Sequence, residues 1–422
     1  MNEQTIGEPQ HAQIMLLTKL ERFSPAAATF SLPAESGCVE LSELLHASLQ
    51  NQELLKDGEM LEFDFLIEGE LLRSSIIQYM ENKQISTETV VNIEFILKLP
   101  SPTPEQSLLH NDWVSCVQAN GQYVLSGCYD NTVKIHTLDG KELLTLPAHS
   151  APVRCLSWLS TGDDVQTFVT GSHDQLLHVW RWETSSNSIR CLYKCAGHAF
   201  SVEDVTASPD RLQFASVSRD MTLKIWSTDE RGVSLNTEEA PAKKRKTHEV
   251  QTKVPIVTLA GHHEGVVGVC WREPSDLVTV GLDHTIRLWN LEMQSNTQTI
   301  TSSKALLAID CSPISGKFVT GSSDRHVRLW DSKVSDASMV IGNFSSHTGW
   351  VSSVKWSERD ENLFVSGSYD NLTKLWDIRS PKTPLFDLTG HNDKVLAVDW
   401  SRPSHIISGG ADNSLNIFAY KS

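Results

Sequence analysis

Aspartate, histidine and serine recur together along most of this 422-residue sequence. These residue types can activate a serine hydroxyl for nucleophilic attack, with histidine as the base and aspartate as its orienting partner. A hydrolytic triad is therefore the first chemical interpretation to consider. Seven segments carry the aspartate: DNTVKIH from Asp130, DQLLHVW from Asp174, DMTLKIW from Asp220, DHTIRLW from Asp283, DRHVRLW from Asp324, DNLTKLW from Asp370 and DNSLNIF from Asp412.

The repetition itself favours a structural role for these residues. A histidine after a small residue precedes five of the aspartates by 21 to 25 positions: His149, His198, His262, His347 and His391. The aspartates are spaced by 44, 46, 63, 41, 46 and 42 residues. An enzyme needs one triad, whereas a repeat architecture needs the same set in every unit. We therefore interpret the set as part of a repeated building block.

The pattern resembles the WD-repeat family over about residues 105–420. That resemblance implies a mainly β fold, a seven-bladed propeller in which an Asp occupies the turn before the third strand of each blade and accepts a hydrogen bond from the His. A serine and a tryptophan would extend this network, with Trp at the sixth position after the Asp in five repeats. The fifth repeat has no such histidine, and the first has His110 followed by Asn111. We expect those two blades to lack part of the network and to rely more on packing.

The last repeat ends too soon after Asp412 to supply its own outer strand. The segment 104–110 stands where 142–149 stands one repeat later, and it is the natural donor of that strand. Closing the ring with strands from both ends of the repeat region would remove an exposed sheet edge. We therefore expect the propeller to span residues 105–422.

Composition points to an intracellular protein without a metal or disulfide framework. The first residues are polar and acidic, and no apolar run approaches the ~18 residues that a membrane span requires. The eight cysteines form no CxxC pair, which is typical of buried thiols in a reducing compartment. No Walker loop or nucleophile elbow is present, so we expect no enzyme, no cofactor and no small-molecule substrate.

An insert of about twenty residues interrupts the spacing between the third and fourth repeats. Residues 227–254 are polar and lack apolar periodicity, which predicts a disordered loop between the third and fourth strands of a blade. The loop carries a compact basic run, Lys243, Lys244, Arg245 and Lys246, in a protein of net charge −16. We interpret the run as a nuclear localisation signal, although a solvated charge run or a weak contact with RNA phosphates is an alternative.

The amino-terminal region predicts a small α+β domain over residues 12–98, after a disordered tail (1–11) and before a Pro-rich linker (99–104). Strand patterns occur at 12–20, 30–34, 62–69 and 90–99, and helical patterns occur at 41–50 and 74–83. This order matches a ubiquitin-like, β-grasp domain. Residues 1–98 contain 16 acidic and 6 basic residues, a net charge of −10. Such a domain favours a cationic partner or a metal that lacks a ligand.

The two regions together resemble the WD-repeat protein 12 family of ribosome-biogenesis factors. The resemblance is carried by FDFLIEGELLRSSIIQYM (63–80), ISTETVVNIEF (85–95) and HNDWVSCV (110–117). It implies a notchless-like ubiquitin-like domain ahead of seven WD repeats. It also implies a protein of the nucleus, nucleolus and nucleoplasm that works with pescadillo and a block-of-proliferation protein in rRNA processing and large-subunit maturation. Contact with rRNA in the preribosome would be indirect.

The same resemblance singles out Glu88. In this family the ubiquitin-like domain binds the adhesion site of the AAA ATPase midasin, and a carboxylate from the loop after the second helix completes the coordination of a bound Mg²⁺. Matching the motif puts that carboxylate at Glu88. The chemistry is sound because Mg²⁺ takes near-octahedral oxygen ligands. From the residues alone, Glu88 is one of sixteen acids on a solvated surface.

A different class of function is a substrate receptor of a cullin–RING ubiquitin ligase. The sequence Trp376-Asp377-Ile378-Arg379 fits the WDxR pattern by which such propellers bind their adaptor. The pattern is weak, because Trp-Asp is a common ending of this repeat and an Arg two positions later arises easily by chance. Copurification with pescadillo and pre-rRNA, or with a cullin adaptor, would separate the two hypotheses.

Overall fold

The computed structural model describes residues 11–23, 29–52, 54–55, 61–86, 89–229, 250–331 and 339–421. The chain divides into two compact units, residues 1–100 with the short segment 379–385 and residues 101–378 with 386–422. No helix in the described part of the chain is long and apolar enough to span a membrane.

The first unit has a β-grasp arrangement, as the sequence predicts. Its five-stranded sheet has the order β2-β1-β5-β3-β4, in which β1 and β5 are parallel and the other pairs antiparallel. The elements are β1 (His11–Leu17), η1 (Glu21–Phe23), β2 (Thr29–Pro33), α1 (Cys38–Asn51), β3 (Phe63–Ile67), β4 (Glu70–Leu71), α2 (Ile76–Lys83) and β5 (Val91–Leu97). The two-residue strand β4 is the one element that the sequence pattern did not predict.

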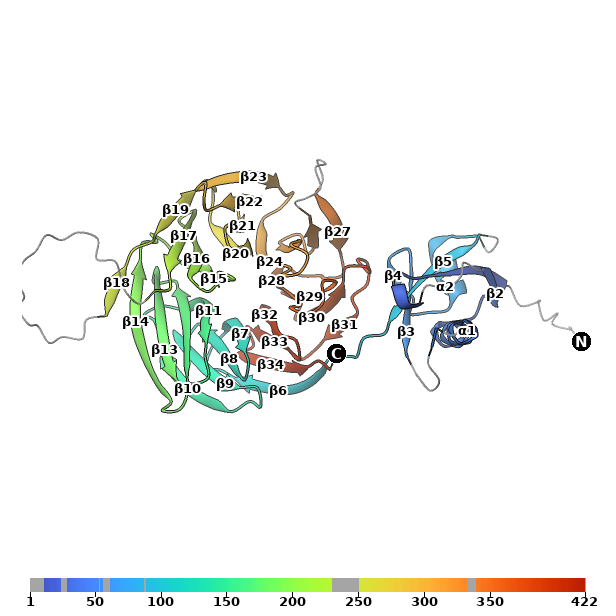
Figure 1. Ribbon diagram of the computed structural model, residues 1–422, viewed down its shortest axis with the longest axis horizontal. Coiled ribbons are helices and arrows are strands. Elements are labelled where there is room, and N and C mark those ends of the chain that lie inside the picture. The colour runs from blue at the N-terminus through green and yellow to red at the C-terminus, as the bar shows by residue number, and fades with distance from the viewer. Residues whose placement is uncertain are drawn as a thin grey trace, which may run out of the picture. The chain divides into compact units, whose positions relative to one another are not determined.

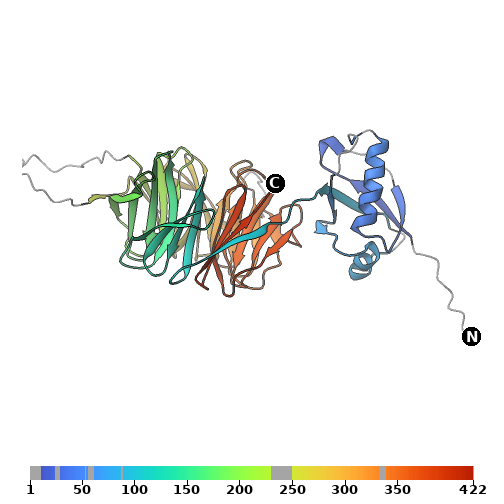
Figure 2. The ribbon, with the colours of Figure 1, turned by 90° about the horizontal axis from the view of Figure 1, so that it is seen from below.

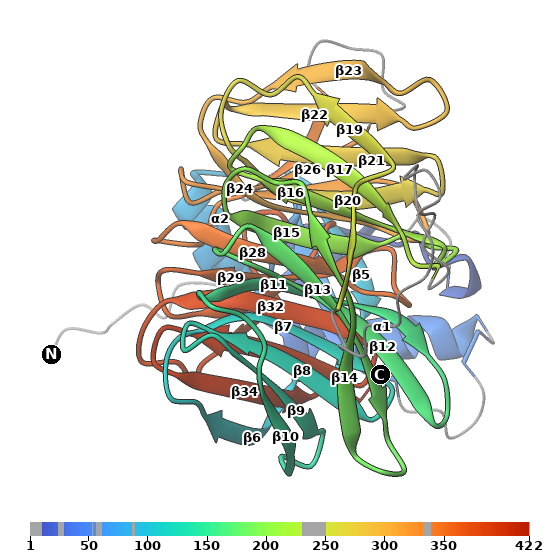
Figure 3. The ribbon, with the colours of Figure 1, turned by 90° about the vertical axis from the view of Figure 1, so that its left-hand side faces the viewer.

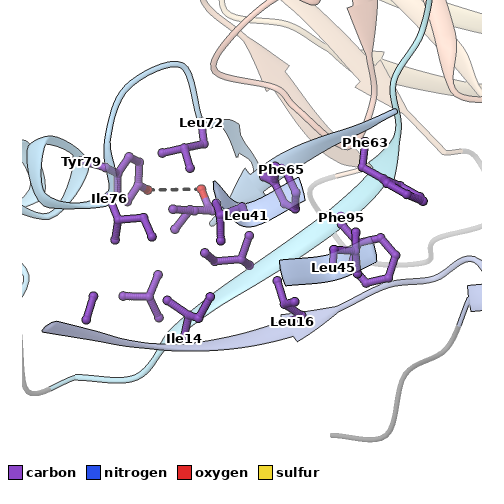
Figure 4. Close-up of a cluster of buried hydrophobic side chains, with 14 of the residues drawn as sticks. Ile14, Leu16, Leu41, Leu45, Phe63, Phe65, Leu72, Ile76, Tyr79 and Phe95 are labelled. Atoms are coloured by element: carbon purple, nitrogen blue, oxygen red, sulfur yellow. Dashed lines mark hydrogen bonds between the residues drawn. The ribbon is translucent and has the colours of Figure 1, made fainter. Parts of the chain in front are cut away.

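Helix α1 covers this sheet through leucines spaced four residues apart. Leu41, Leu45 and Leu49 are fully buried on one helical face, as a 3.6-residue period requires. At its start the carboxylate of Glu40 accepts a hydrogen bond from the amide of Gly37 at 2.8 Å, which satisfies one of the free donors of the first turn. Figure 4 shows the resulting core, where the Tyr79 hydroxyl donates to the Ile67 carbonyl at 3.2 Å.

The described residues of the second unit form seven sheets, which Figure 1 shows arranged as blades around a ring. Blades 1 to 3 contain β7 (Val114–Asn120), β8 (Tyr123–Cys128), β9 (Thr132–Thr137) and β10 (Glu142–Pro147); β11 (Val153–Thr161), β12 (Val165–Ser172), β13 (Leu176–Glu183) and β14 (Ser188–Ala196); and β15 (Val202–Ala207), β16 (Gln213–Ser218), β17 (Thr222–Ser227) and β19 (Val257–Ala260). Blades 4 and 5 contain β20 (Val266–Glu273), β21 (Asp276–Gly281), β22 (Thr285–Asn290) and β23 (Ser295–Thr301); and β24 (Leu306–Cys311), β25 (Phe318–Ser322), β26 (Val327–Trp330) and β27 (Val340–Phe344). Blades 6 and 7 contain β28 (Val351–Trp356), β29 (Leu363–Ser368), β30 (Thr373–Asp377) and β31 (Phe386–Leu388); and β32 (Val395–Arg402), β33 (His405–Gly410), β34 (Ser414–Ala419) and β6 (Thr103–Leu109). Each blade is antiparallel and is numbered here from the innermost strand outward.

Blade 7 confirms the expected closure of the ring. Strand β6 pairs antiparallel with β34, with Leu109 opposite Ser414 and Thr103 opposite Ala419. Figure 2 shows β6 running along the carboxyl-terminal strands. Pro104 lies opposite Phe418 on this outermost strand, where a missing N–H removes no ladder bond to a further strand. The mixed sheet therefore ties the two ends of the repeat region together.

Strand β18 (Gln251–Lys253), just after the insert, adds to a different blade from the rest of its repeat. It pairs in parallel with β14, so blade 2 has five strands. The chain then returns to blade 3 as β19, which pairs with β17. The insert thus connects the third and fourth strands of blade 3, as predicted, and residues 230–249 of it lie outside the described part of the chain.

Side chains of the innermost strands join neighbouring blades around the central channel. Each accepts a hydrogen bond from a backbone amide of the next blade, at 2.8–3.3 Å. The acceptor and donor pairs are Gln118–Trp158, Ser157–Ala207, Asp204–Val269, Asp310–Trp356, Ser353–Val398 and Asp399–Ala119. Figure 3 shows the innermost strands β7, β11 and β32 side by side. Six of the seven joints between blades therefore carry a hydrogen bond of this kind.

The seventh joint, between blades 4 and 5, corrects the expectation that the cysteines form no disulfide. Cys270 on β20 and Cys311 on β24 are paired as a disulfide across it. They occupy the strand positions that hold the acceptor and the donor at four of the other joints. The spacing of 41 residues is one repeat long, so no short cysteine motif could have revealed the pair. The other six cysteines are free, four of them buried.

Candidate functional site

In four blades the turn Asp belongs to a hydrogen-bonded chain of four side chains. In blade 6, His347 Nδ1 lies 2.8 Å from Asp370 Oδ2, and His347 Nε2 lies 2.7 Å from Ser366 Oγ. Trp376 Nε1 donates to the same hydroxyl at 2.8 Å. The equivalent sets are Asp174, His149, Thr170 and Trp180; Asp220, His198, Ser216 and Trp226; and Asp283, His262, Thr279 and Trp289. In blade 7 the chain stops at Ser408, because Phe418 has no N–H to donate.

These sets are unsuited to hydrolysis because no substrate can reach them. The His347 side chain is 1% exposed and Ser366 is fully buried. The serine oxygen is already occupied by the Trp donor and the His ring. Their geometry instead fixes a turn, since Asp370 also accepts from the amides of Thr348 and Leu372. The chemistry of the repeated triad is therefore architectural.

Burial alone would raise the pKa of the Asp370 carboxyl. The hydrogen bond from His347 and its charge, together with the amides of Thr348 and Leu372, outweigh burial and lower this pKa to about 2. Asp174 and Asp220 show the same depression of the pKa, with the hydrogen bonds from His149 and His198 overcoming burial. The ionised form of each turn Asp is thus the one that the fold stabilises.

The residue after each turn Asp adopts a left-handed backbone conformation, with φ between 62° and 72°. These residues are Asn131, Gln175, Met221, His284, Arg325, Asn371 and Asn413. Asparagine tolerates this conformation and most other side chains disfavour it. The turns at Met221 and Arg325 therefore carry a backbone cost that the surrounding hydrogen bonds offset.

The fifth blade replaces the missing histidine in a way that corrects the expectation of packing alone. Both oxygens of Asp324 are bound by the Arg328 guanidinium, and Oδ1 also accepts from the amide of His326. Trp330 still donates to Thr320. A basic residue stands four positions after the turn Asp in other blades too, as in Lys134 and Lys374, where it pairs with a carboxylate on the outer strand. Sequence alone does not show that Arg328 turns back to the Asp instead.

The first blade carries two buried histidines in place of the usual set. His110 Nε2 lies 2.8 Å from Ser126 Oγ, but Asn111 and not His110 reaches Asp130, at 3.4 Å. His136 occupies the Trp position, and its ring lies 5.4 Å from that of His110. Burial is the largest influence on both, and it lowers the pKa of each ring to about 4. Blade 1 therefore lacks the link between its histidine and its turn Asp, as expected.

Glu88 lies outside the described residues, together with Thr87. The flanking chain is ordered: α2 ends at Lys83, the Thr89 amide donates to the Ser86 carbonyl at 3.1 Å, and β5 begins at Val91. Beside this loop lies a hollow of about 530 Å³ at the edge of the sheet. Its lining includes the carboxylates of Glu68 and Glu94 and the exposed side chain of Val90.

Two other predicted sites give different outcomes. Lys243, Lys244, Arg245 and Lys246 lie in the segment that the structure does not describe. The WDxR segment is described, and Trp376 and Asp377 are both fully buried within blade 6. A buried Asp377 agrees with the ordinary ending of a repeat and not with an adaptor-binding motif. Among the described residues no group of three or more His, Cys, Asp or Glu could hold a metal ion.

Comparison with known proteins agrees with this architecture. Residues 12–80 match the model of the NLE (NUC135) domain. Seven segments match the WD domain, G-beta repeat: 103–137, 140–181, 189–227, 253–290, 294–331, 338–377 and 382–418. The first of these begins in β6, in keeping with the role of that strand in the ring.

Whole-length relatives carry the same combination. A protein of Ixodes scapularis named "Ribosome biogenesis protein WDR12 homolog" is 43% identical, covering 99% of this chain and all of the relative. Proteins of the same name from Culex quinquefasciatus and Anopheles gambiae are each 40% identical, covering 97% and 96% of this chain and 95% and 94% of theirs. With an NLE domain, seven WD repeats and relatives that match from end to end, the chain belongs to the WDR12 family.

Proposed function

We propose that this chain is a non-catalytic assembly factor for the large ribosomal subunit. The observation that carries the proposal is the joint presence of an NLE domain and seven WD repeats, at 43% identity over 99% of the chain to a protein named for ribosome biogenesis. The factor works in rRNA processing as a scaffold, in complex with pescadillo and a block-of-proliferation protein. Its place of action is the nucleus, nucleolus and nucleoplasm, on large-subunit preribosomes.

A non-catalytic role is supported by the state of the residues that could do chemistry. The histidines that pair with Asp174, Asp220, Asp283 and Asp370 are at most 1% exposed, and each is engaged at both ring nitrogens. The conserved geometry of the turns is used to hold blades, whose outer faces and loops then offer surface to other proteins. Binding is the function that such a framework serves best.

Sedimentation of the tagged chain from nuclear extract tests the proposal. We expect the protein to travel with large-subunit precursors and to copurify with pescadillo. A protein found only at the top of the gradient, without pescadillo, would contradict it. Copurification with a cullin adaptor in place of pescadillo would favour a ubiquitin-ligase receptor.

The ubiquitin-like domain, in this proposal, is presented to midasin through Glu88. A carboxylate here would complete the shell of a Mg²⁺ held by the ATPase, so that motion driven by ATP could pull on the factor and release it. Support comes from the position of the residue, between the left-handed end of α2 at Gln84 and the start of β5. The adjacent hollow, with Glu68 and Val90 in its lining, offers surface around that loop.

Two variants with a matched control test this role. We expect Glu88→Ala to abolish Mg²⁺-dependent binding to midasin in a pull-down, and Glu88→Asp to weaken it because the carboxylate is one methylene shorter. Glu81→Ala removes an exposed acid from the end of α2 and should leave binding intact. Assembly with pescadillo should be unaffected in all three. If Glu88→Ala still bound midasin and the binding remained sensitive to a chelator, Glu88 would not be the ligand.

A further inference from the structure

A basic hollow lies on the propeller face opposite the Asp turns. It is formed by the connections between the first and second strands of blades 1, 6 and 7 and by the end of β34. Its volume is about 570 Å³. The described residues that line it are Gly121, Arg359, Ser401, Arg402, Pro403, Ser404, Tyr420 and Lys421. Three of these are cations and none is a carboxylate, in a protein with a net charge of −16.

Arg402 is held in place by a chain of hydrogen bonds behind the hollow. Its Nε donates to Ser404 Oγ at 2.9 Å, and that hydroxyl lies 2.8 Å from His405 Nδ1. His405 Nε2 in turn lies 3.2 Å from Glu105 Oε2 on β6. Only Nε is used in this way, and within the described chain the terminal N–H groups of Arg402 have no acceptor. A guanidinium fixed at Nε with its terminal groups free is arranged to bind a phosphate.

The surrounding frame is rigid, and it supplies further donors. The Tyr420 amide donates to the Ser404 carbonyl at 2.7 Å, and the Tyr420 ring packs edge-on against Trp400. The Tyr420 hydroxyl is buried and has no partner among the described residues. Burial, followed by the charges of Asp360 and Asp377, raises the pKa of Tyr420 to about 12, so the hydroxyl stays protonated and able to donate.

The other two cations are exposed and uncommitted. Within the described part of the chain, the side chains of Arg359 and Lys421 form no ion pair or hydrogen bond. By contrast, the basic residues of the blades, such as Lys134 and Lys374, are paired with carboxylates. The backbone at Arg359 is fixed by the amide hydrogen bond to Ser357 and by the closure of the following turn at Asp360. The hollow therefore concentrates unneutralised positive charge on ordered backbone.

We propose that this hollow binds phosphate groups of an RNA chain, with Arg402 as the fixed ligand and Arg359 and Lys421 as flanking ones. The choice of RNA rests on the proposed function in ribosome assembly, while the affinity for phosphate rests on the hollow itself. Phosphate contacts by Arg and Lys position a protein on RNA without reading its sequence, which suits a hollow that lacks exposed aromatic side chains.

The test compares two triple variants of the full chain. Arg359→Gln/Arg402→Gln/Lys421→Gln empties the hollow of charge, and Lys141→Gln/Arg190→Gln/Lys304→Gln removes three exposed cations elsewhere. Both keep residues 243–246, so any contribution of that run is common to both. Binding of a fluorescently labelled oligouridylate is followed by anisotropy over a range of salt concentrations. The double variant Arg359→Gln/Lys421→Gln leaves the Arg402 network intact and guards against misfolding.

For the hollow variant we expect affinity to fall about tenfold at low salt, with a salt slope smaller by about two, as loss of two to three phosphate contacts predicts. The double variant should lose part of this, the control triple less than about twofold, and inorganic phosphate should compete with the RNA for the wild-type chain. Equal losses in both triples, or no binding by the wild type, would overturn the inference. Tighter binding of a phosphoserine peptide than of oligouridylate would overturn the choice of RNA. Sedimentation with preribosomes is measured separately, so a wild-type chain that travels with them while the hollow variant binds RNA normally would sink this inference alone.

Discussion

At the scale of single residues, the same side chains serve the turns in most blades, and the exceptions are the informative positions. Asp370 and Asp324 hold equivalent turns through different partners, a buried histidine in one and a half-buried arginine in the other. Their comparison separates what the histidine contributes from what the turn itself contributes.

Asp370→Ala should destabilise the propeller more than Asp324→Ala. Removal of Asp370 leaves His347 and two turn amides without an acceptor in a buried setting, which costs roughly 2–3 kcal/mol. Loss of Asp324 frees an arginine that can turn toward solvent, and we expect about 1 kcal/mol. Chemical denaturation of the two variants measures the difference. Equal losses would undermine the hydrogen-bond account of the turns.

The two histidines of blade 1 should make the propeller sensitive to acid. Each folded-state pKa is near 4, below the unfolded value of about 6.5. The unfolded chain therefore binds protons first, and stability that is complete above pH 6.5 is lost as the pH falls toward 4. His136→Phe, which copies Phe418 of blade 7, should reduce this loss by about 2 kcal/mol. The control His263→Gln alters an exposed ring and should leave the pH profile unchanged; identical profiles for wild type and His136→Phe would refute the assignment.

At the scale of elements, the sequence predicts what repeats and fails where one blade differs from the next. The turn aspartates locate the third strand of every blade, and the helix and strand periods of residues 12–98 yield a β-grasp with one short strand missed. The bonds between blades come from Gln118, Ser157, Asp204 and others of unlike type, so they have no common signature. The Cys270–Cys311 pair and the Arg328 contact escape for the same reason. Three-dimensional neighbourhood, and not spacing, decides them.

The left-handed position after each turn Asp gives a direct test of local backbone preference. Met221→Asn should stabilise the blade 3 turn by roughly 0.5–1 kcal/mol, because asparagine tolerates φ near 65° better than methionine does. The Met221 side chain is 44% exposed, so little packing is lost. The reverse change, Asn371→Met, should destabilise blade 6 by a similar amount. Thermal unfolding of both variants checks the pair, and shifts of the same sign would contradict the backbone explanation.

At the scale of the whole molecule, charge is distributed by domain. Residues 1–98 hold −10 of the −16, since 16 acids stand against 6 bases there, and the remaining −6 belongs to the rest of the chain. An acidic ubiquitin-like domain suits a metal that lacks a ligand, and the basic hollow on the propeller suits phosphate. Two surfaces of opposite preference let one chain engage an ATPase and a preribosome with separate contacts.

The basic run 243–246 predicts how the chain reaches the nucleus. It lies within a connection of blade 3 whose described flanks, β17 and β18, end and begin at Ser227 and Gln251, so the strands of the blade do not depend on its sequence. Replacing all four basic residues by alanine should therefore leave the thermal midpoint unchanged while moving a fluorescent fusion from nucleus to cytoplasm. Residues 236–252 alone, fused to a cytosolic reporter, should carry it into the nucleus, because an import receptor reads such a run as a short basic segment. A control fusion with the four positions changed to alanine should stay outside. A wild-type segment that leaves the reporter cytosolic would mean that import depends on another part of the chain or on a partner, and that the run is a solvated charge cluster.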